Sequence, residues 1–116
     1  MNLIKEVLLS SIKNTADWRG CKAVEYPEDA LRNNNSSDAL LILHTHVEAL
    51  PDDHSLFQVM EKCVVAGAPL TVYEKENYMI SRYGFFRDPG PGPGADPEEF
   101  VCELTALYEQ EGREAE

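Results

Sequence analysis

Three histidines and two aspartates lie within a short stretch near the middle of the chain. The segment LLILHTHVEALPDDHS, residues 40–55, contains every histidine of the 116-residue protein. His44 and His46 are two positions apart, so on an extended strand both imidazoles would point to the same side. Neutral imidazole is a common zinc ligand, and a carboxylate from Asp52 or Asp53 would leave one metal position for water. The metal would acidify this water for hydrolysis.

The same cluster also has a purely structural interpretation. Histidine, threonine and aspartate are common where a strand reaches a surface loop. Asp53 or Ser55 could accept a hydrogen bond from the first turn of a following helix, which is the usual role of a helix cap. The sequence therefore leaves two predictions open for this segment, a zinc site or a surface turn without a cofactor.

The elements that would hold the histidines follow from the apolar pattern around them. ALLIL, residues 39–43, has no polar alternation, which is typical of a strand buried on both faces of a parallel sheet. A helical stripe from Leu56 to Val64 comes next, with Gly67 where the helix would end, and residues 70–74 predict a second strand. These elements would form a βαβ unit. Ligands of open α/β sheets bind beyond the carboxyl ends of the strands, where the first two histidines would lie.

The rest of the chain completes a small α/β fold. Apolar residues from Leu3 to Ile12 repeat at helical spacing, which predicts an N-terminal amphipathic helix. The segments 21–26 and from Tyr78 onward predict two further strands. We therefore predict an α/β domain over residues 1–87, with a mixed sheet of about four strands, a βαβ core and helices packed on it.

A linker and a last helix follow this domain. Residues 88–95 alternate proline and glycine, which removes hydrogen-bond donors and breaks any periodicity. Asp96 then has the features of a helix cap, with proline after it and glutamate three residues later. An apolar stripe continues to Tyr108 and must dock on its own domain or on a partner. Residues 96–116 are therefore predicted to form an acidic C-terminal helix and tail.

Negative charge is concentrated in this last segment. From Asp96 onward there are eight acidic side chains and one arginine, which contribute −7 to a net charge of −11. Such a chain is repelled by nucleic acid phosphates and by anionic lipid, so we expect neither as a direct partner. A basic protein surface is the natural complement. The residues expected to contact it are Glu98, Glu99, Glu103 and Glu109, with Tyr108 as an anchor.

The spacing of the cysteines and the N-terminal residues indicate where in the cell the protein is expected. The three cysteines are widely and irregularly spaced, which disfavours a disulfide framework and favours a reducing cytoplasmic location. Lys5 and Glu6 interrupt the N-terminal apolar pattern, which is atypical of a signal peptide. No apolar run reaches the roughly 18 residues that cross a bilayer.

One motif resembles a known family. ILHTHVEALPDDHSLFQVMEK contains an H-x-H followed at a distance by serine, and is similar to the metal motif of the JAB/MPN (JAMM) metalloproteases. The resemblance covers residues 40–75 and implies that His44 and His46 bind zinc. Gln58 stands where the family has an aspartate ligand and Val47 where it has proline, which also fits a degenerate relative without metal. A looser similarity of DALLIL and AGAPLTVYE is to Rossmann-like proteins of the nucleoside deoxyribosyltransferase type.

These features predict a non-catalytic, cytosolic binding or regulatory protein, such as an inhibitor, an immunity-type protein or an accessory factor. It would need no cofactor and would dock an acidic surface on a basic protein partner. The alternative prediction is a JAB-like zinc-dependent hydrolase that uses His44 and His46 with Asp52 or Asp53.

Overall fold

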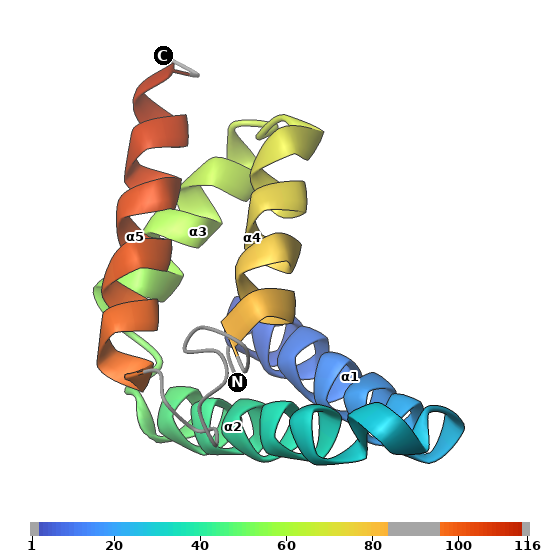
Figure 1. Ribbon diagram of the computed structural model, residues 1–116. Coiled ribbons are helices and arrows are strands. Elements are labelled where there is room, and N and C mark those ends of the chain that lie inside the picture. Colours follow the sequence, from blue (N-terminus) through green and yellow to red (C-terminus); the bar gives the residue numbers. More distant parts are fainter. Residues whose placement is uncertain (1–2, 84–95, 115–116) are drawn as a thin grey trace.

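The fold is helical, and the predicted α/β class is wrong. The computed structural model describes residues 3–83 and 96–114 (of 112–114 only the helical backbone), and no strand occurs within those ranges (Figure 1). The expected linker, residues 88–95, lies outside the described residues. In chain order the elements are α1 (Leu3–Glu25), η1 (Pro27–Asp29), α2 (Ala30–Ala49), α3 (Ser55–Val65), α4 (Leu70–Tyr83) and α5 (Pro97–Glu114).

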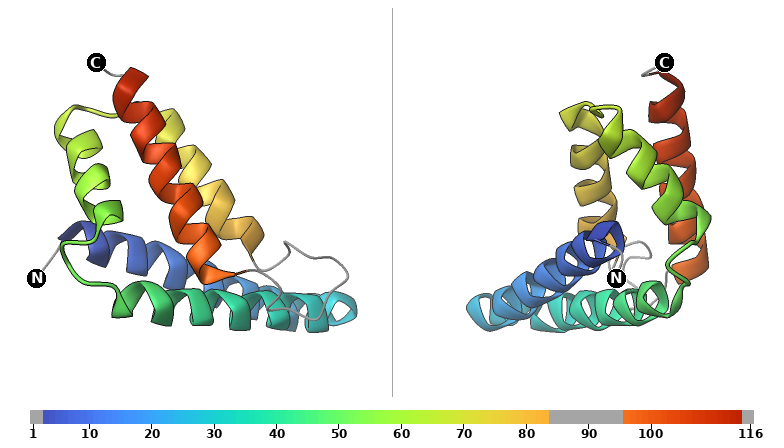
Figure 2. Two further views of the ribbon diagram at one scale, coloured as in Figure 1. Left: turned by 90° about the vertical axis from the view of Figure 1, so that its left-hand side faces the viewer. Right: turned by 180° about the vertical axis from the view of Figure 1, so that it is seen from behind.

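The two longest helices form one layer, and the others stand on it. α1 and α2 run antiparallel, are joined through η1 and lie side by side along most of their length (Figures 1 and 2). α3, α4 and α5 rise from this pair, and α5 packs on α3, on α4 and on α2. The fold is therefore a helical hairpin that supports a second group of three helices.

The run ALLIL lies in the middle of α2. Ala39, Leu40 and Leu43 are fully buried, whereas Leu41 and Ile42 are 40% and 46% exposed. The run therefore contributes to two faces of a helix. Buried residues at helical spacing continue along α2 before and after it. Ile42 alone is β-branched in this run, and alanine and leucine are strong helix formers. The length and composition of the run suggested a strand, but the helical repeat of buried residues along the whole of α2 decides the structure.

The predicted strands at 70–74 and from Tyr78 are both parts of α4. Val72 and Ile80 are buried, and Glu76 occupies the inward position between them. A carboxylate at an inward position interrupts the apolar stripe, so the helical period was not visible in the sequence. The part of the second predicted strand that follows α4 lies outside the described residues.

The predicted N-terminal helix is confirmed but extends through 23 residues, and most of the predicted strand at 21–26 is its last turn. Ala16 and Ala23 continue the buried stripe of this helix. The Ser37 hydroxyl of α2 donates to the Ala16 carbonyl at 2.9 Å, and a side chain at Gly20 would meet the same hydroxyl. Small residues on this face let α1 and α2 approach closely along their length.

The two helices predicted on either side of α4 are confirmed. α3 is followed by Gly67 with φ of 74°, a left-handed conformation that glycine adopts without strain and that commonly ends a helix. At the start of α5, the Asp96 carboxylate accepts a hydrogen bond from the Glu98 N–H at 2.9 Å. This is the cap that the sequence predicted.

α5 packs its apolar stripe into the common core. Phe100, Val101, Leu104 and Tyr108 are each at most 5% exposed and belong to the cluster formed with α1 to α4. The sequence left open whether this stripe docks on its own domain or on a partner. The structure shows that it docks on its own domain.

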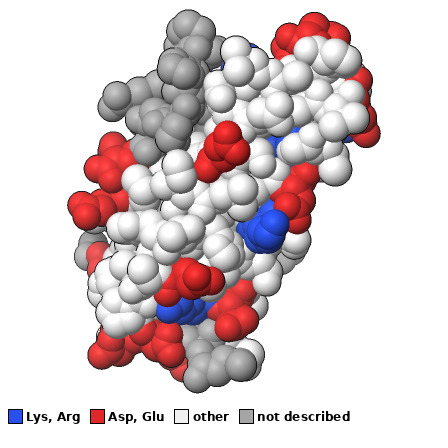
Figure 3. Space-filling model, turned by 90° about the horizontal axis from the view of Figure 1, so that it is seen from below, with Lys and Arg blue, Asp and Glu red and all other residues white. Residues whose placement is uncertain are grey.

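The outer face of the α1–α2 layer is mostly uncharged. Acidic side chains lie mainly around its edge, and basic side chains are few (Figure 3). No helix within residues 3–83 and 96–114 combines the length and the apolar composition needed to cross a membrane.

Candidate functional site

The histidines do not form a metal site, and the zinc prediction is corrected. His44 and His46 both lie on α2, where residues two positions apart point to nearly opposite sides. Neither Asp52 nor Asp53 joins them, because within the described part of the chain no three His, Cys, Asp or Glu side chains form a group that could hold a metal ion. The predicted geometry required an extended segment, in which these imidazoles would share one side.

His54 and Asp52 instead shape the turn between α2 and α3. The His54 Nδ1 accepts a hydrogen bond from the Leu56 N–H at 3.1 Å and so caps α3, in place of the predicted Asp53 or Ser55. The Lys5 Nζ of α1 donates to the Leu50 carbonyl at 2.7 Å and to the Asp52 carboxylate at 3.3 Å. These bonds tie the turn to α1. The structural interpretation therefore accounts for this end of the segment.

The four glutamates expected to contact a partner are exposed. Glu98, Glu99, Glu103 and Glu109 all have exposed side chains on α5. At 3.6 residues per turn, Glu98 and Glu109 share one face of the helix, whereas Glu99 and Glu103 share another. The structure therefore leaves all four carboxylates accessible but divides them between two faces.

Tyr108, the expected anchor, is part of the core. Its side chain is 1% exposed, and its hydroxyl donates to the Glu76 carboxylate of α4 at 3.1 Å. Burial and the nearby Glu76 charge raise the pKa of Tyr108 well above its ordinary value, so the phenol stays protonated as a donor. Tyr108 holds α5 against α4 and presents no surface to a partner.

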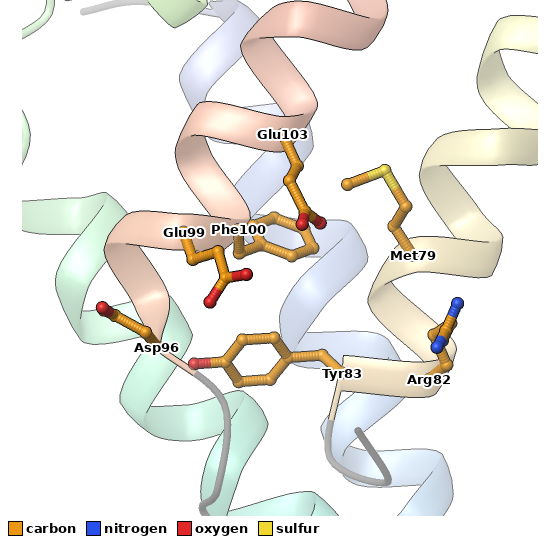
Figure 4. A pocket seen from close by; sticks show the side chains of 7 residues that line it. All are labelled: Met79, Arg82, Tyr83, Asp96, Glu99, Phe100 and Glu103. Atoms are coloured by element: carbon orange, nitrogen blue, oxygen red, sulfur yellow. The ribbon is translucent and has the colours of Figure 1, made fainter. Parts of the chain in front are cut away.

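A pocket lies where the end of α4 meets the start of α5. Met79 and Tyr83 of α4 and Phe100 of α5 supply its apolar walls, and Glu99 and Glu103 line it from α5 (Figure 4). The Glu99 carboxylate points into the space between the Phe100 and Tyr83 rings, and the Glu103 carboxylate points toward the Phe100 ring (Figure 4). The cavity measures about 60 Å³, which is room for a few water molecules or the end of one long side chain.

The walls of this pocket are fixed by packing. The Tyr83 and Phe100 rings meet edge to face, with centroids 5.5 Å apart and an interplanar angle of 86°. Both side chains are buried, at 4% and 5% exposed. Burial and the charge of nearby Asp96 raise the pKa of Tyr83 to about 12, so this phenol is neutral at physiological pH. The walls are therefore rigid and uncharged.

The carboxylates of the pocket repel one another. Glu99 and Glu103 are four residues apart on one helix, a spacing at which like charges destabilise the helix by roughly 0.2–0.5 kcal/mol. Arg82 also lines the pocket, and its guanidinium lies over the Tyr78 ring of α4, 5.6 Å from the centroid. A positive group placed between the two glutamates would relieve their repulsion. The arrangement therefore favours a cation with an apolar stem.

The sequence predicted Glu99 and Glu103 as contact residues but not the apolar walls beside them. Met79 and Tyr83 were assigned to a strand of a sheet, so they were not expected on a helix that packs beside α5. Their spacing of four residues does place them on one helical face, which was the available signal. The pairing of that face with Phe100 depends on the tertiary fold.

Comparisons of the chain with protein-family models, with curated proteins and with solved structures found no match. The resemblance of residues 40–75 to the JAB/MPN family gains no support from them.

Proposed function

We propose that the protein is a non-catalytic binding or regulatory protein that docks the acidic face of α5 on a basic protein partner. A lysine or arginine of the partner inserts into the pocket between α4 and α5. The observation that carries this proposal is that Glu99 and Glu103 line one pocket with the buried rings of Tyr83 and Phe100. The partner's cation meets the carboxylates, and its methylene stem packs on the apolar walls.

The charge around the pocket supports the same partner. Glu98 and Glu109 extend the exposed negative surface along α5, so a basic partner is attracted before it makes contact. Charged rim residues of this kind affect the association rate and the salt dependence most. The inserted side chain contributes most of the specificity, because it is the group that becomes desolvated.

The proposal includes a cytosolic location for the protein. Cys63 is buried and Cys21 and Cys102 are exposed, and each is a free thiol. Exposed free thiols persist in a reducing compartment, so we place the protein in the cytosol.

The first experiment selects partners without assuming one. A random peptide library is selected on the wild-type protein and, in parallel, on the double variant Glu99→Gln/Glu103→Gln. We expect wild-type selections to enrich lysine or arginine beside apolar residues, and the double variant to lose this enrichment. Selected peptides should bind the variant at least about tenfold more weakly, the loss expected when a charge-assisted hydrogen bond is removed.

A matched variant separates the pocket from net charge. Glu61→Gln/Glu74→Gln removes the same two charges from exposed positions on α3 and α4. We expect this control to keep the affinity within about threefold, because distant exposed charges act only through a screened field. Equal losses in the two double variants would show that net charge alone attracts the peptide, and would contradict the pocket.

A spectroscopic measurement places the bound peptide. The chain has three methionines, of which Met79 lines the pocket and Met60 is in the core. In protein labelled with ¹³C at the methionine methyl groups, a selected peptide should shift the Met79 signal and leave the Met60 signal in place. A peptide that binds without moving the Met79 signal would place the contact elsewhere.

A further inference from the structure

α1 carries a second stripe of residues on the side that faces away from the core. Its buried stripe packs against α2, α3 and α4. On the opposite side of the helix, exposed residues follow one another at alternating steps of four and three positions. These seven residues, the outer stripe, are Leu3, Val7, Ser10, Asn14, Asp17, Cys21 and Val24. Such spacing keeps side chains on one face along a helix and is the spacing of coiled-coil contacts.

Both ends of the outer stripe are apolar and strongly exposed. Leu3 is 73% exposed, Val7 is 63% exposed and Val24 is 81% exposed. Single exposed apolar side chains are ordinary on a protein surface, but here they recur along one face of one helix. A helix that is apolar on two opposite sides is expected to pack against neighbours on both of them. The core covers one side of α1, and the outer stripe is left exposed to solvent.

The outer stripe has the same pattern in both directions along the helix. Asn14 lies at its middle, between the polar residues Ser10 and Asp17, and two apolar side chains follow toward each end. Val7 and Cys21 are each seven positions from Asn14, and a cysteine thiol behaves as a small apolar group. When two copies of α1 lie antiparallel about Asn14, each apolar end therefore meets the apolar end of the other copy. The two polar centres meet as well, so the stripe is complementary to itself.

The charges of α1 permit this contact although the whole chain is acidic. The net charge of −11 opposes self-association through most faces of the protein, whereas α1 itself has four basic and three acidic side chains. Asp17 is the one charged residue of the outer stripe, and the Lys13 ammonium pairs with its carboxylate at 3.0 Å. A parallel pair of helices would place the two Asp17 carboxylates opposite one another. The antiparallel pair instead places each of them beside Ser10 of the other copy.

We propose that the outer stripe of α1 is an interface at which two copies of the protein form an antiparallel pair with two-fold symmetry. In such a contact every residue pair occurs twice, so the few apolar side chains count double. Burial of the apolar ends supplies the affinity. The polar centre fixes the direction of the helices, as a polar residue does in a coiled coil. The contact lies on the side of α1 away from the core, so it is independent of the α4–α5 pocket and of its basic partner.

Sedimentation equilibrium over a range of protein concentrations measures the association. We expect the mean mass of the wild-type protein to rise with concentration from that of the monomer toward twice that value. Val7→Ser/Val24→Ser should weaken the pair at least about tenfold, because two apolar side chains of each copy are no longer buried in it. The matched control, Val65→Ser/Leu70→Ser, changes two side chains that are as exposed, at 82% and 78%, but lie on α3 and α4. This control should associate like the wild type.

A cross-link tests the direction of the two helices without weakening the contact. In Val7→Cys/Cys102→Ser, the introduced thiol and Cys21 are the exposed thiols, since Cys63 is buried. Air oxidation should join the introduced thiol to Cys21 of the other copy, whereas a parallel pair would join identical positions. A monomer mass at every concentration up to about 1 mM would overturn the proposal. Equal weakening in the two double variants, or cross-links between identical positions alone, would also overturn it.

Discussion

Both halves of α5 carry acidic side chains, but the first half exposes all of them whereas the second half buries one. In the first half, Glu98, Glu99 and Glu103 are exposed, and two of them line an accessible pocket. In the second half, Tyr108 and Glu111 are buried, at 1% and 5% exposed. Acidic residues counted along the sequence therefore overstate the acidic surface, because part of that charge stabilises the core.

The second half of α5 forms a polar network with α3 and α4. The Tyr108 hydroxyl donates to Glu76 at 3.1 Å, and the Lys75 ammonium pairs with Glu111 at 2.9 Å, so two bonds join α4 to α5. On the other side, the Cys63 thiol of α3 donates to the Tyr108 carbonyl at 3.2 Å. Burial raises the pKa of the Cys63 thiol, which therefore stays protonated and unreactive. The second half of α5 therefore holds the buried Tyr108 and Glu111 beside the exposed Glu109, whereas Glu98, Glu99 and Glu103 of the first half are all exposed.

The largest expected effect on stability distinguishes two adjacent residues of the second half, one buried and one exposed. Tyr108→Ala should lower the free energy of unfolding by about 3–5 kcal/mol, since it creates a cavity and leaves the Glu76 carboxylate without its donor. Glu109→Ala should change it by less than about 0.5 kcal/mol, because the side chain is exposed. Urea denaturation measures both. Comparable losses in the two variants would contradict the assignment of Tyr108 to the buried network and of Glu109 to the exposed surface.

A smaller effect on the free energy of unfolding is expected at the start of α5. Asp96→Ala removes the acceptor for the Glu98 N–H and should cost about 1 kcal/mol, whereas Asp96→Asn should keep most of the cap. The Met79 methyl signal should move in Asp96→Ala, since the cap fixes the turn of helix that carries Glu99. An unchanged stability in Asp96→Ala would show that the first turn of α5 is held by packing alone.

Local signals predicted part of the fold. The N-terminal helix was predicted from its apolar stripe alone, and α3 and α5 from a stripe with a glycine or a cap; Gly67 and the Asp96 cap were placed correctly. These signals act between residues a few positions apart, so they are present in the sequence itself. The acidic residues of the candidate pocket were found in the same way, from their density along the chain.

The errors arose where a polar residue faces the core. Glu76 on α4 and Ser36 on α2 are buried, and each interrupts an apolar stripe that would have indicated a helix. Glu76 is acceptable at its position because the Tyr108 hydroxyl, 32 residues away, donates to it. No local pattern contains that partner, so the helix was interpreted as two short strands. The apolar walls of the pocket were missed for the same reason.

The smallest expected effect concerns Glu76 and depends on pH. Burial raises the pKa of this carboxyl above its ordinary value of 4.5, and the hydrogen bond from Tyr108 offsets part of the rise. The folded protein therefore binds the Glu76 proton more tightly than the unfolded chain does. The resulting stabilisation is complete below about pH 4.5 and is lost as the pH rises through the raised pKa.

Glu76→Gln isolates this contribution, because the amide cannot ionise and still accepts the Tyr108 hydrogen bond. Relative to wild type, its free energy of unfolding should increase between pH 4.5 and neutrality, by a few tenths to about 1 kcal/mol. Glu74→Gln, two positions away on the same helix and exposed, is the matched control for the loss of one carboxylate. Thermal unfolding followed by circular dichroism at several pH values measures both variants. A constant difference for Glu76→Gln would mean that this carboxylate is solvated in the folded protein, and that water reaches the contact between α4 and the second half of α5.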